Sequence, residues 1–491
     1  MNIIKKFSVS SLLTISLFIL PQSIYAESYR TSTHEAVCNI EKSWLTNPSL
    51  PTEVAKSAPD GSSNFCDFYQ FSSQTYLYLM SEKSSGMRNF QDLSQFPLLE
   101  HDIKGNPVDS CDEKVTGMTL RTSLDKSSLG TTQAGSSSTI YDKSGDIVYY
   151  DVRFDKKTCE TTASAVEMKK TNLINFPSGT TELKFAWKVL TSAEITENKH
   201  VTQVQTISGK AVTLGLLGMH IAVATTDHPE FVWATYEHNN NTPNCVASGV
   251  QTTTDWTFSS SSCTADLDKM DADAIEACKF NQPGSNEIDP KGAPTNLCRV
   301  HPNGTASGDL KAGENISDIN QQNTQLVNLL KKPNTVESMQ VLTNYFNVGA
   351  IWVSDITKNS GGIGVPNERG SLRLANTVAE SDFQHVNLTS GFASNCFGCH
   401  NYIGTENTVS NNITSQSLSH IFKAIKTGQG QSIDVTTSTT IMDNSAAQRI
   451  CGYTDKNSAG TCKNTASYLK WNGKWTNINN STGSVCGCEL D

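Results

Sequence analysis

Hydrophobic residues recur at every second position through much of the middle of the chain. The clearest example is ELKFAWKVL at 182–190, in which Leu183, Phe185, Trp187 and Val189 alternate with other residues. Such alternation is typical of a strand with one buried face. Similar patterns occur in TIYDKSGDIVYYDVRF at 139–154, HVTQVQTI at 200–207, AVTLGLLGMHIAVAT at 211–225 and EFVWATYEH at 230–238. Because short turns join these runs, they predict a mainly antiparallel sheet, and the first of them predicts a hairpin turning at 143–146.

Helical periodicity appears on both sides of this region. DFYQFSSQTYLYLMS at 67–81 predicts an amphipathic helix whose buried face carries Phe68, Phe71, Thr75 and Leu79. SDINQQNTQLVNLLKK at 317–332 predicts another helix, capped by Ser317 and ended by Pro333. TVESMQVLTNYFNVGAIWV at 335–353 predicts a helix that runs into a short strand at 350–353.

These elements predict an α+β fold, with a β-rich antiparallel-sheet body and flanking helices, followed by a small irregular or helical region. The expected segments are a signal peptide at 1–26, the β-rich body with disulfides at 27–360, a further region at 361–430 and a polar, cysteine-containing tail at 431–491. Within the sheet, Gly215 and Gly218 predict a bulge or a close backbone approach.

The first 26 residues have the pattern of a secretory signal peptide. Lys5 and Lys6 precede an apolar stretch at 7–20, Pro21 breaks it, and Ala26 ends a cleavage site. The stretch is short and contains several serines, which disfavours a membrane anchor. No later segment is apolar enough to cross a bilayer, so we expect a periplasmic or secreted protein with no integral membrane segment after cleavage.

Charge and cysteine content refine this picture. The formal net charge of −10 becomes −12 when cleavage removes Lys5 and Lys6, and no basic stripe is present, so we expect no nucleic-acid partner. Export permits disulfides, and the chain has 14 cysteines. Connectivity cannot be derived from the sequence, but neighbouring cysteines favour the pairs Cys38–Cys66, Cys278–Cys298 and Cys451–Cys462. Residues 239–316 contain four cysteines and many turn residues. This composition predicts a loop segment held together by disulfides.

The segment Cys396-Phe397-Gly398-Cys399-His400 forms a CxxCH motif. Two cysteines at this spacing can form thioethers with the two vinyl groups of one haem, and the following imidazole reaches the iron. The motif predicts one covalent haem c on Cys396 and Cys399, with His400 as the proximal iron ligand, and makes 361–430 the haem-attachment region. A thioredoxin-like thiol pair would need a strand before the motif and a helix after it, and a structural zinc site would need a second CxxC.

Several segments resemble a group of exported bacterial monohaem cytochrome c-family proteins. The resemblance runs from about 60 to 400 and is carried by CDFYQFSSQTYLYL, LGLLGMHIAVATTDHPEFVWATYEHNNNTPN, NYFNVGAIW, LRLANTVAES and NCFGCHNY. It implies haem attachment at Cys396, Cys399 and His400. Because members of this group have no settled biochemical role, the resemblance implies no substrate.

Three residues are candidates for the sixth ligand of the iron. These are His220 in the apolar run, His420 in SLSHIFKAIK and Met442 in STTIMDNS; an open or water-bound position is the alternative. Two protein ligands favour electron transfer, whereas an open position permits peroxide or gas chemistry.

Three functions therefore follow from the motif. The first is single-electron transfer with a redox partner protein, which we favour because CxxCH is the only chemistry that the sequence displays. The second is a peroxidase-like haem oxidoreductase with an open distal site, and the third is a secreted binding protein with an accessory haem. Whether the chain is an enzyme, and its oligomeric state, are left open. Near the 230–238 strand, Glu230, Glu237, His228 and His238 are interpreted as solvated residues rather than acid–base groups.

Overall fold

The computed structural model describes the chain from residue 38 onward, with gaps. The described ranges are 38–83, 86–92, 94–96, 139–167, 176–207, 210–245, 256–264, 278–281, 291–333, 335–360, 367–384, 395–400, 402, 404, 418–419, 450–454, 471–477 and 484–488. The strands are β1 (Tyr149–Phe154), β2 (Thr181–Val189), β3 (Thr202–Ile207), β4 (Lys210–Val223), β5 (Val232–His238), β6 (Tyr345–Val353), β7 (Glu368–Gly370), β8 (Ile450–Thr454), β9 (Trp471–Asn477) and β10 (Ser484–Cys488).

The helices are mostly short. The α-helices are α1 (Ser43–Thr46), α2 (Phe65–Met80), α3 (Lys156–Glu167), α4 (Ser192–Glu197), α5 (Ser261–Thr264), α7 (Ala312–Leu330), α8 (Glu337–Gln340) and α9 (Cys396–Cys399). The described residues also form the 3-10 turns η1 (Asn89–Gln91), η4 (Val341–Asn344) and η5 (Ser381–Gln384).

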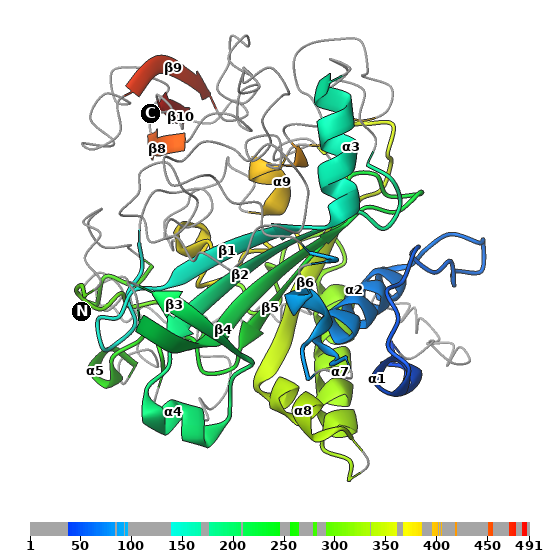
Figure 1. The fold of residues 1–491 in the computed structure, drawn as a ribbon. Coiled ribbons are helices and arrows are strands. Elements are labelled where there is room, and N and C mark those ends of the chain that lie inside the picture. Colours follow the sequence, from blue (N-terminus) through cyan, green and yellow to red (C-terminus); the bar gives the residue numbers. More distant parts are fainter. Residues whose placement is uncertain are drawn as a thin grey trace, which may run out of the picture. The chain divides into compact units, whose positions relative to one another are not determined.

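A seven-stranded antiparallel sheet forms the centre of the protein (Figure 1). Its order is β1-β2-β4-β5-β6-β7, and β3 also pairs with β4. Leu214 of β4 faces both Val189 of β2 and Gln203 of β3, so these two strands lie on opposite edges of β4. Strands β3 and β5 therefore follow one another along the same edge. This sheet with its flanking helices confirms the predicted α+β, β-rich fold; a separate three-stranded sheet, β8-β10-β9, lies in the tail.

One face of the large sheet, here called the helix face, is covered by α2 and α7. The predicted buried face of α2 is confirmed, since Phe68, Phe71, Thr75 and Leu79 are all buried. Phe68 stacks on Trp352 of β6 with ring centroids 3.8 Å apart, and Tyr76 stacks on Tyr236 of β5 at 3.9 Å. Aromatic pairs of this kind add stabilisation beyond their buried area.

Helix α7 begins earlier than the sequence pattern predicts. It starts at Ala312 rather than after Ser317, and Lys311 precedes it in a left-handed conformation. Its first turn carries the buried Asn315, whose amide donates to Thr305. This tertiary contact stabilises a first turn that has little hydrophobic periodicity of its own.

The segment before β6 is also different from the prediction. Only two short turns, α8 and η4, replace the expected helix, and the strand begins at Tyr345 rather than at 350. Six residues of β6 pair with β5, with a register shift at Thr235/Tyr236 opposite Gly349. Pairing with β5 therefore extends the strand into a sequence whose local pattern is ambiguous.

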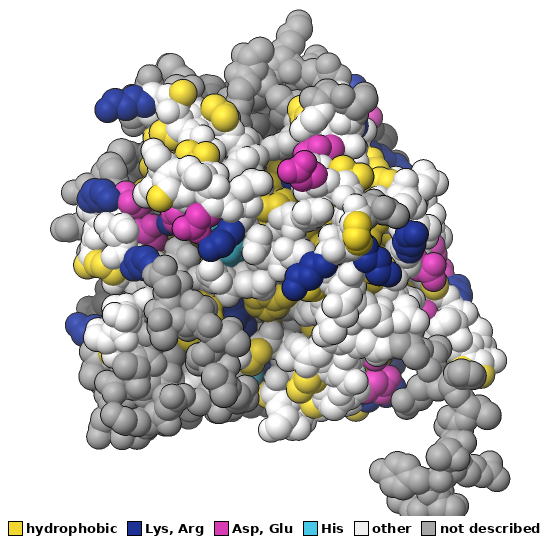
Figure 2. All heavy atoms as spheres, turned by 90° about the horizontal axis from the view of Figure 1, so that it is seen from below, with side chains coloured by type: hydrophobic (Ala, Val, Ile, Leu, Met, Phe, Trp, Pro, Cys, Tyr) yellow, Lys and Arg dark blue, Asp and Glu magenta, His cyan; other side chains and the backbone are white. Residues whose placement is uncertain are grey.

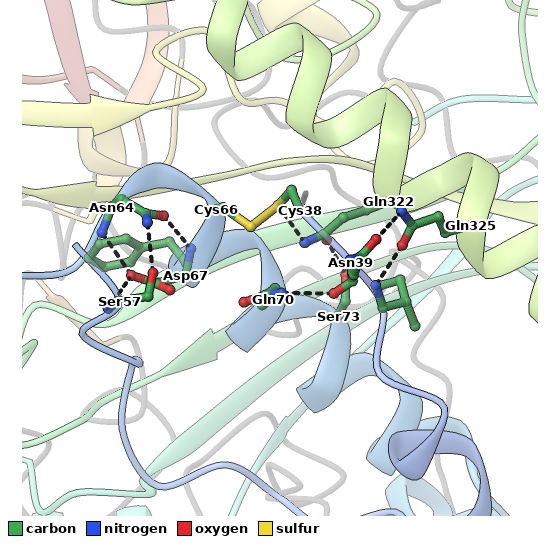
Figure 3. Close-up of a disulfide and its surroundings, with 12 residues drawn as sticks. Cys38, Asn39, Ser57, Asn64, Cys66, Asp67, Gln70, Ser73, Gln322 and Gln325 are labelled. Atoms are coloured by element: carbon green, nitrogen blue, oxygen red, sulfur yellow. Dashed lines mark hydrogen bonds between the residues drawn. A yellow bond between two sulfur atoms is a disulfide. The ribbon is translucent and has the colours of Figure 1, made fainter. Parts of the chain in front are cut away.

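The predicted disulfide Cys38–Cys66 is present and joins the first described residues to α2 (Figure 3). Two hydrogen bonds accompany it: Gln70 donates to the Asn39 carbonyl at 2.8 Å, and the Ile40 amide donates to Gln325 of α7 at 2.8 Å. The segment after Cys38 is thus held against both helices of the helix face.

The predicted pair Cys278–Cys298 is wrong. Cys298 is bonded to Cys245, and Cys278 is bonded to Cys263. The reason is backbone pairing: the Cys245 amide donates to the Arg299 carbonyl at 2.8 Å, which brings Cys245 beside Cys298. The prediction that disulfides hold this loop segment together is confirmed. The predicted pair Cys451–Cys462 includes Cys462, which lies outside the described residues.

The predicted bulge at Gly218 is confirmed. The β2–β4 register shifts between Ala186 and Trp187, opposite Gly218 and Leu216, which marks a bulge in β4. A Cβ on Gly218 would lie 2.7 Å from the side-chain amide of Asn376. The missing side chain therefore makes room for a segment that packs on the sheet from the side opposite to α2 and α7.

A stacked histidine pair lies where β4 passes from β3 to β5. The rings of His200 and His238 are 4.2 Å apart and nearly parallel, at 5°. His238 Nε2 donates to the Lys199 carbonyl, and its Nδ1 accepts from the Asn240 amide. Burial lowers the pKa of His200 to about 4 and the pKa of His238 well below its usual value. Both rings are therefore neutral at pH 7.

We expect this pair to make the protein sensitive to acid. The unfolded chain binds protons at these rings near pH 6.5, whereas folded His200 resists protonation until about pH 4, so stability is lost as pH falls through this window. The charged groups around His200 are Lys188, Glu194, Glu197 and Lys199. From the His200 shift alone the loss is about 3 kcal/mol.

The measurement is the free energy of unfolding in urea at several pH values between 7 and 4. His200→Phe, which keeps an aromatic ring in the stack, should flatten the pH dependence over this range. Val204→Ala in β3 changes a side chain that is 69% exposed and serves as the control. An equally steep pH dependence in His200→Phe would contradict the assignment.

No helix among the described residues is both long and apolar enough to cross a membrane. Figure 2 shows acidic, basic and apolar side chains interspersed over one face of the molecule, so neither sign of charge forms a continuous patch across its described part.

Candidate functional site

The second face of the large sheet, here called the opposite face, is covered mainly by irregular segments. Its apolar cluster joins strand residues to residues from beyond β7; the larger members are Phe154, Phe176, Phe231, Trp233, Ile351, Leu374, Phe397, Tyr402 and Leu418. Two cross-strand rows lie on this face. One contains Glu182, Ala222 and Trp233, and the next contains Lys184, His220 and Thr235.

The CxxCH motif forms the one-turn helix α9 on this face. The His400 amide donates to the Cys396 carbonyl at 2.8 Å, which closes the turn. Phe397, between the two cysteines, is fully buried, and its ring lies 6.4 Å from that of Trp233. Cys396 is partly exposed. The variable position of the motif thus anchors it in the apolar cluster.

Both ends of the motif are fastened to the body of the protein. Before it, the Asn395 side chain donates to Glu368 of β7 at 2.7 Å and to the Leu372 carbonyl at 3.0 Å. After it, the Tyr402 hydroxyl donates to the Ile356 carbonyl at 2.7 Å. These contacts, rather than helical propensity, hold the four-residue helix in place.

His400 has a defined tautomer. Its Nδ1 lies 2.9 Å from the Leu418 carbonyl oxygen. Because a carbonyl oxygen can only accept, Nδ1 carries the proton, and the lone pair of the neutral ring is on Nε2. Burial lowers the pKa of His400 to about 4. The hydrogen bond to the Leu418 carbonyl opposes this shift but does not cancel it. Because the pKa stays near 4, His400 is neutral at physiological pH.

Trp233 supports the His400 ring. The two ring centroids are 4.5 Å apart with an angle of 39° between the planes. The indole N–H of Trp233 donates to the Glu230 carbonyl at 3.0 Å, which orients the indole. The motif histidine therefore has a fixed wall on one side and a fixed acceptor for Nδ1.

Two residues of the next row, Lys184 and His220, act electrostatically on His400 together with Glu380 from beyond β7. The charges of Lys184, Glu380 and His220 all influence its pKa, Lys184 and His220 lowering it and Glu380 raising it. His220 Nε2 lies 2.8 Å from Glu380 Oε1. Burial raises the pKa of Glu380, but His220, Lys184 and the Asn376 amide outweigh this and lower it, so Glu380 is ionised.

Two acids with raised pKa values, the buried Glu182 and the partly buried Glu368, flank the motif, and the sequence analysis missed both. Burial raises the pKa of Glu182 on β2 to about 8, although a hydrogen bond from Ser419 opposes the shift. Burial likewise raises the pKa of Glu368 on β7 to about 7, opposed by its bond from Asn395. One oxygen of each carboxyl group is buried and has no hydrogen-bond partner among the described residues. At pH 7 Glu182 is therefore mostly protonated, and Glu368 is about half protonated.

The structure describes some of the site residues predicted from the sequence and not others. Cys396 and His400 lie on the opposite face, where His220 of β4 is within electrostatic reach of His400. In His220, Nε2 faces Glu380, so ligation of iron through Nε2 would have to displace that contact. His420 and Met442 lie outside the described residues.

The four residues interpreted as solvated are instead buried or paired. Glu237 and His238 are buried, with Glu237 bound to Arg299. His228 Nδ1 lies 2.9 Å from the buried Glu230. The expectation of solvated strand ends is wrong because other segments cover both ends of β5. Arg299 and Thr377 bind Glu237. Phe68 packs on His228, and the Val353 amide donates to Glu230.

No group of three or more His, Cys, Asp or Glu side chains in the described part of the chain could hold a metal ion by itself. Comparison with known proteins found no family model, no curated protein and no solved structure that matches the chain.

Proposed function

We propose that this protein is an exported monohaem c-type cytochrome that transfers single electrons to or from a redox partner protein. The haem would be bound covalently by Cys396 and Cys399, with His400 as the proximal iron ligand. The observation that carries the proposal is the tautomer of His400, the residue directly after the one-turn helix of the CxxC segment. Its Nδ1–H donates to the Leu418 carbonyl at 2.9 Å.

The residues of the site fit such a group. A histidine that binds a metal ion almost always donates its other ring N–H to a carbonyl or carboxylate, which orients the ring and strengthens the ligand. His400 has this arrangement, and its neutral ring presents the lone pair of Nε2. A bound haem would supply an iron that cycles between two oxidation states. The antiparallel sheet and the four-residue α9 do not resemble the strand and long helix that frame a thioredoxin-like thiol pair.

The surrounding side chains would exclude water and hold His400 still. Trp233 packs on Phe397 and His400 of the motif. Asn395 and Tyr402 fasten the two ends of the motif. A rigid, largely dry surrounding reduces the reorganisation that accompanies electron transfer.

A second candidate is a haem-dependent oxidoreductase with an open distal site. It is favoured by one observation: His220 and the ionised Glu380 form an acid–base pair within electrostatic reach of His400. Acid–base groups beside an open iron position permit peroxide chemistry. His220, His420 and Met442 stay the predicted distal ligands under the first candidate.

The test is expression of the full chain in a bacterial host that attaches c-type haem. We expect one covalent haem per chain, detected by intact mass and by the absorption spectrum of the denatured protein. Cys396→Ala and Cys399→Ala should each remove one thioether, and the double variant should carry no covalent haem. His400→Met should keep the covalent bond but change the ligand-field spectrum.

The control is the variant Cys263→Ala/Cys278→Ala, which removes two cysteines of a disulfide and should keep the haem. Absence of covalent haem in the unmodified chain would contradict the proposal. Carbon monoxide separates the two candidates, since a low-spin, unreactive iron excludes the oxidoreductase, and a high-spin iron that binds carbon monoxide favours it.

A further inference from the structure

Glu182 is an unusual residue for the middle of a sheet. It lies in β2 between Phe154 of β1 and Ala222 of β4, and 8% of its surface is exposed. Burying a carboxyl group that lacks a full set of hydrogen bonds costs stability, and an apolar side chain would avoid that cost. The partner of its carboxyl group indicates what the residue does.

That partner is Ser419, a fully buried residue next to Leu418. The carbonyl of Leu418 and the Cα of Ser419 belong to one peptide group, which is planar and rigid. Fixing the side chains at the two ends of this group therefore fixes the direction of its carbonyl. Leu418 packs in the apolar cluster of the opposite face, and Ser419 is bonded to Glu182.

The carbonyl held in this way is the one that accepts from His400 Nδ1. A continuous set of contacts thus runs from the interior strand β2 through Ser419 and Leu418 to the ring of His400. Because β2 pairs with strands on both sides, it offers a rigid base for these contacts.

We propose that Glu182 and Ser419 are positioning residues for His400: their hydrogen bond orients the Leu418 carbonyl, which holds the proton on Nδ1 and reserves Nε2 for the iron. This inference rests on the proposed function for the role of Nε2. The orientation of the ring itself is independent of any bound group.

The protonation state of Glu182 supports this role. Its raised pKa, about 8, keeps the carboxyl group mostly neutral at pH 7, so its bond with the buried Ser419 adds little buried negative charge. A neutral carboxyl group can still donate and accept hydrogen bonds. Glutamine has the same size and similar hydrogen-bonding capacity, which makes Glu182→Gln the conservative variant.

The first measurement uses the full chain without haem and ¹⁵N-labelled histidine. The ring nitrogen shifts report the tautomer, and His400→Gln identifies the His400 signals by their loss. At pH 7 we expect the Nδ1–H tautomer in the unmodified chain and in Glu182→Gln. Ser419→Ala and Glu182→Leu should give a mixture with the Nε2–H tautomer.

The second measurement is the reduction potential of the haem-bearing chain. Loss of the bond from Nδ1–H weakens the imidazole as an electron donor and disfavours the oxidised iron. The potential should therefore rise in Ser419→Ala and Glu182→Leu and stay unchanged in Glu182→Gln. Ser259→Ala is the matched control, because it removes another buried hydroxyl, bonded to the Leu297 carbonyl at 2.6 Å.

Thermal unfolding first verifies that each variant is folded. The inference is overturned if Ser419→Ala has the tautomer and potential of Ser259→Ala, or if Glu182→Gln changes as much as Glu182→Leu. Failure of the proposed function is a separate result, namely no covalent haem in the unmodified chain. In that case the tautomer measurement still decides the positioning role.

Discussion

Replacing Glu237 with alanine is expected to lower the free energy of unfolding by about 3–5 kcal/mol. The carboxylate of Glu237 lies 2.6 Å from Arg299 Nη2, and both side chains are almost fully buried. It also accepts from the amide of Thr377 at 2.7 Å and from its hydroxyl at 2.8 Å. Removing it leaves the Arg299 charge without its carboxylate in a place that water does not reach.

The measurement is urea unfolding at pH 7. Glu314→Ala is the control, because it breaks an ion pair with Lys311 in which both side chains are about half exposed, and it should cost less than about 1 kcal/mol. Replacing both buried partners, Glu237→Met with Arg299→Met, should recover part of the loss, since no unpaired charge then remains. A loss no larger in Glu237→Ala than in Glu314→Ala would show that water reaches Arg299 and compensates it.

Removing the disulfide Cys245–Cys298 is expected to cost about 4 kcal/mol in the double alanine variant. The bond closes a loop with a sequence separation of 53, and the chain-entropy relation assigns a larger effect to a longer loop. Arg299 follows Cys298 directly, so loss of the bond also loosens the segment that carries the partner of Glu237.

Comparison with Cys263–Cys278 makes this expectation specific. That bond has a separation of 15 and lies in the same loop segment, and its removal should cost about 3 kcal/mol. Urea unfolding of the two double variants gives the order directly. A larger loss for the shorter loop would mean that native contacts, rather than loop closure, determine the contribution of these bonds.

The strands and α2 were predictable because their patterns are local and strong. Leu183, Phe185 and Trp187 alternate along β2 and all pack on the helix face. Phe68 and Phe71 of α2 recur with helical spacing and pack against the helix face of the sheet. In both elements the period of the hydrophobic residues equals the period of the backbone, so a short window of sequence contains the information.

Element boundaries were less predictable. Helix α7 starts at Ala312 because Asn315 is bonded to Thr305, and β6 starts at Tyr345 because β5 pairs with it. Disulfide pairing failed for the same reason, since the contact between Cys245 and the 298–299 backbone joins residues more than fifty positions apart. Contacts of this range have no signature in a local window.

The candidate site divides in the same way. Cys396, Cys399 and His400 are adjacent in sequence, and their spacing alone predicts haem attachment. Glu182 and Lys184 lie on the opposite face of the sheet. In an antiparallel sheet with one buried face, polar residues on the other face ordinarily contact water. An irregular layer covers that face, and its segments have no periodicity from which their position could be inferred.

By itself, the sequence determined the class of fold, the main strands, the first long helix and the three residues of the CxxCH motif, because each depends on spacing along the chain. Only the tertiary structure decided that Leu418 faces His400 Nδ1, that Glu182 lies behind Ser419 and that His220 is paired with Glu380. The physical reason is that the protonation and direction of a side chain depend on burial and on partners that folding brings from distant parts of the chain.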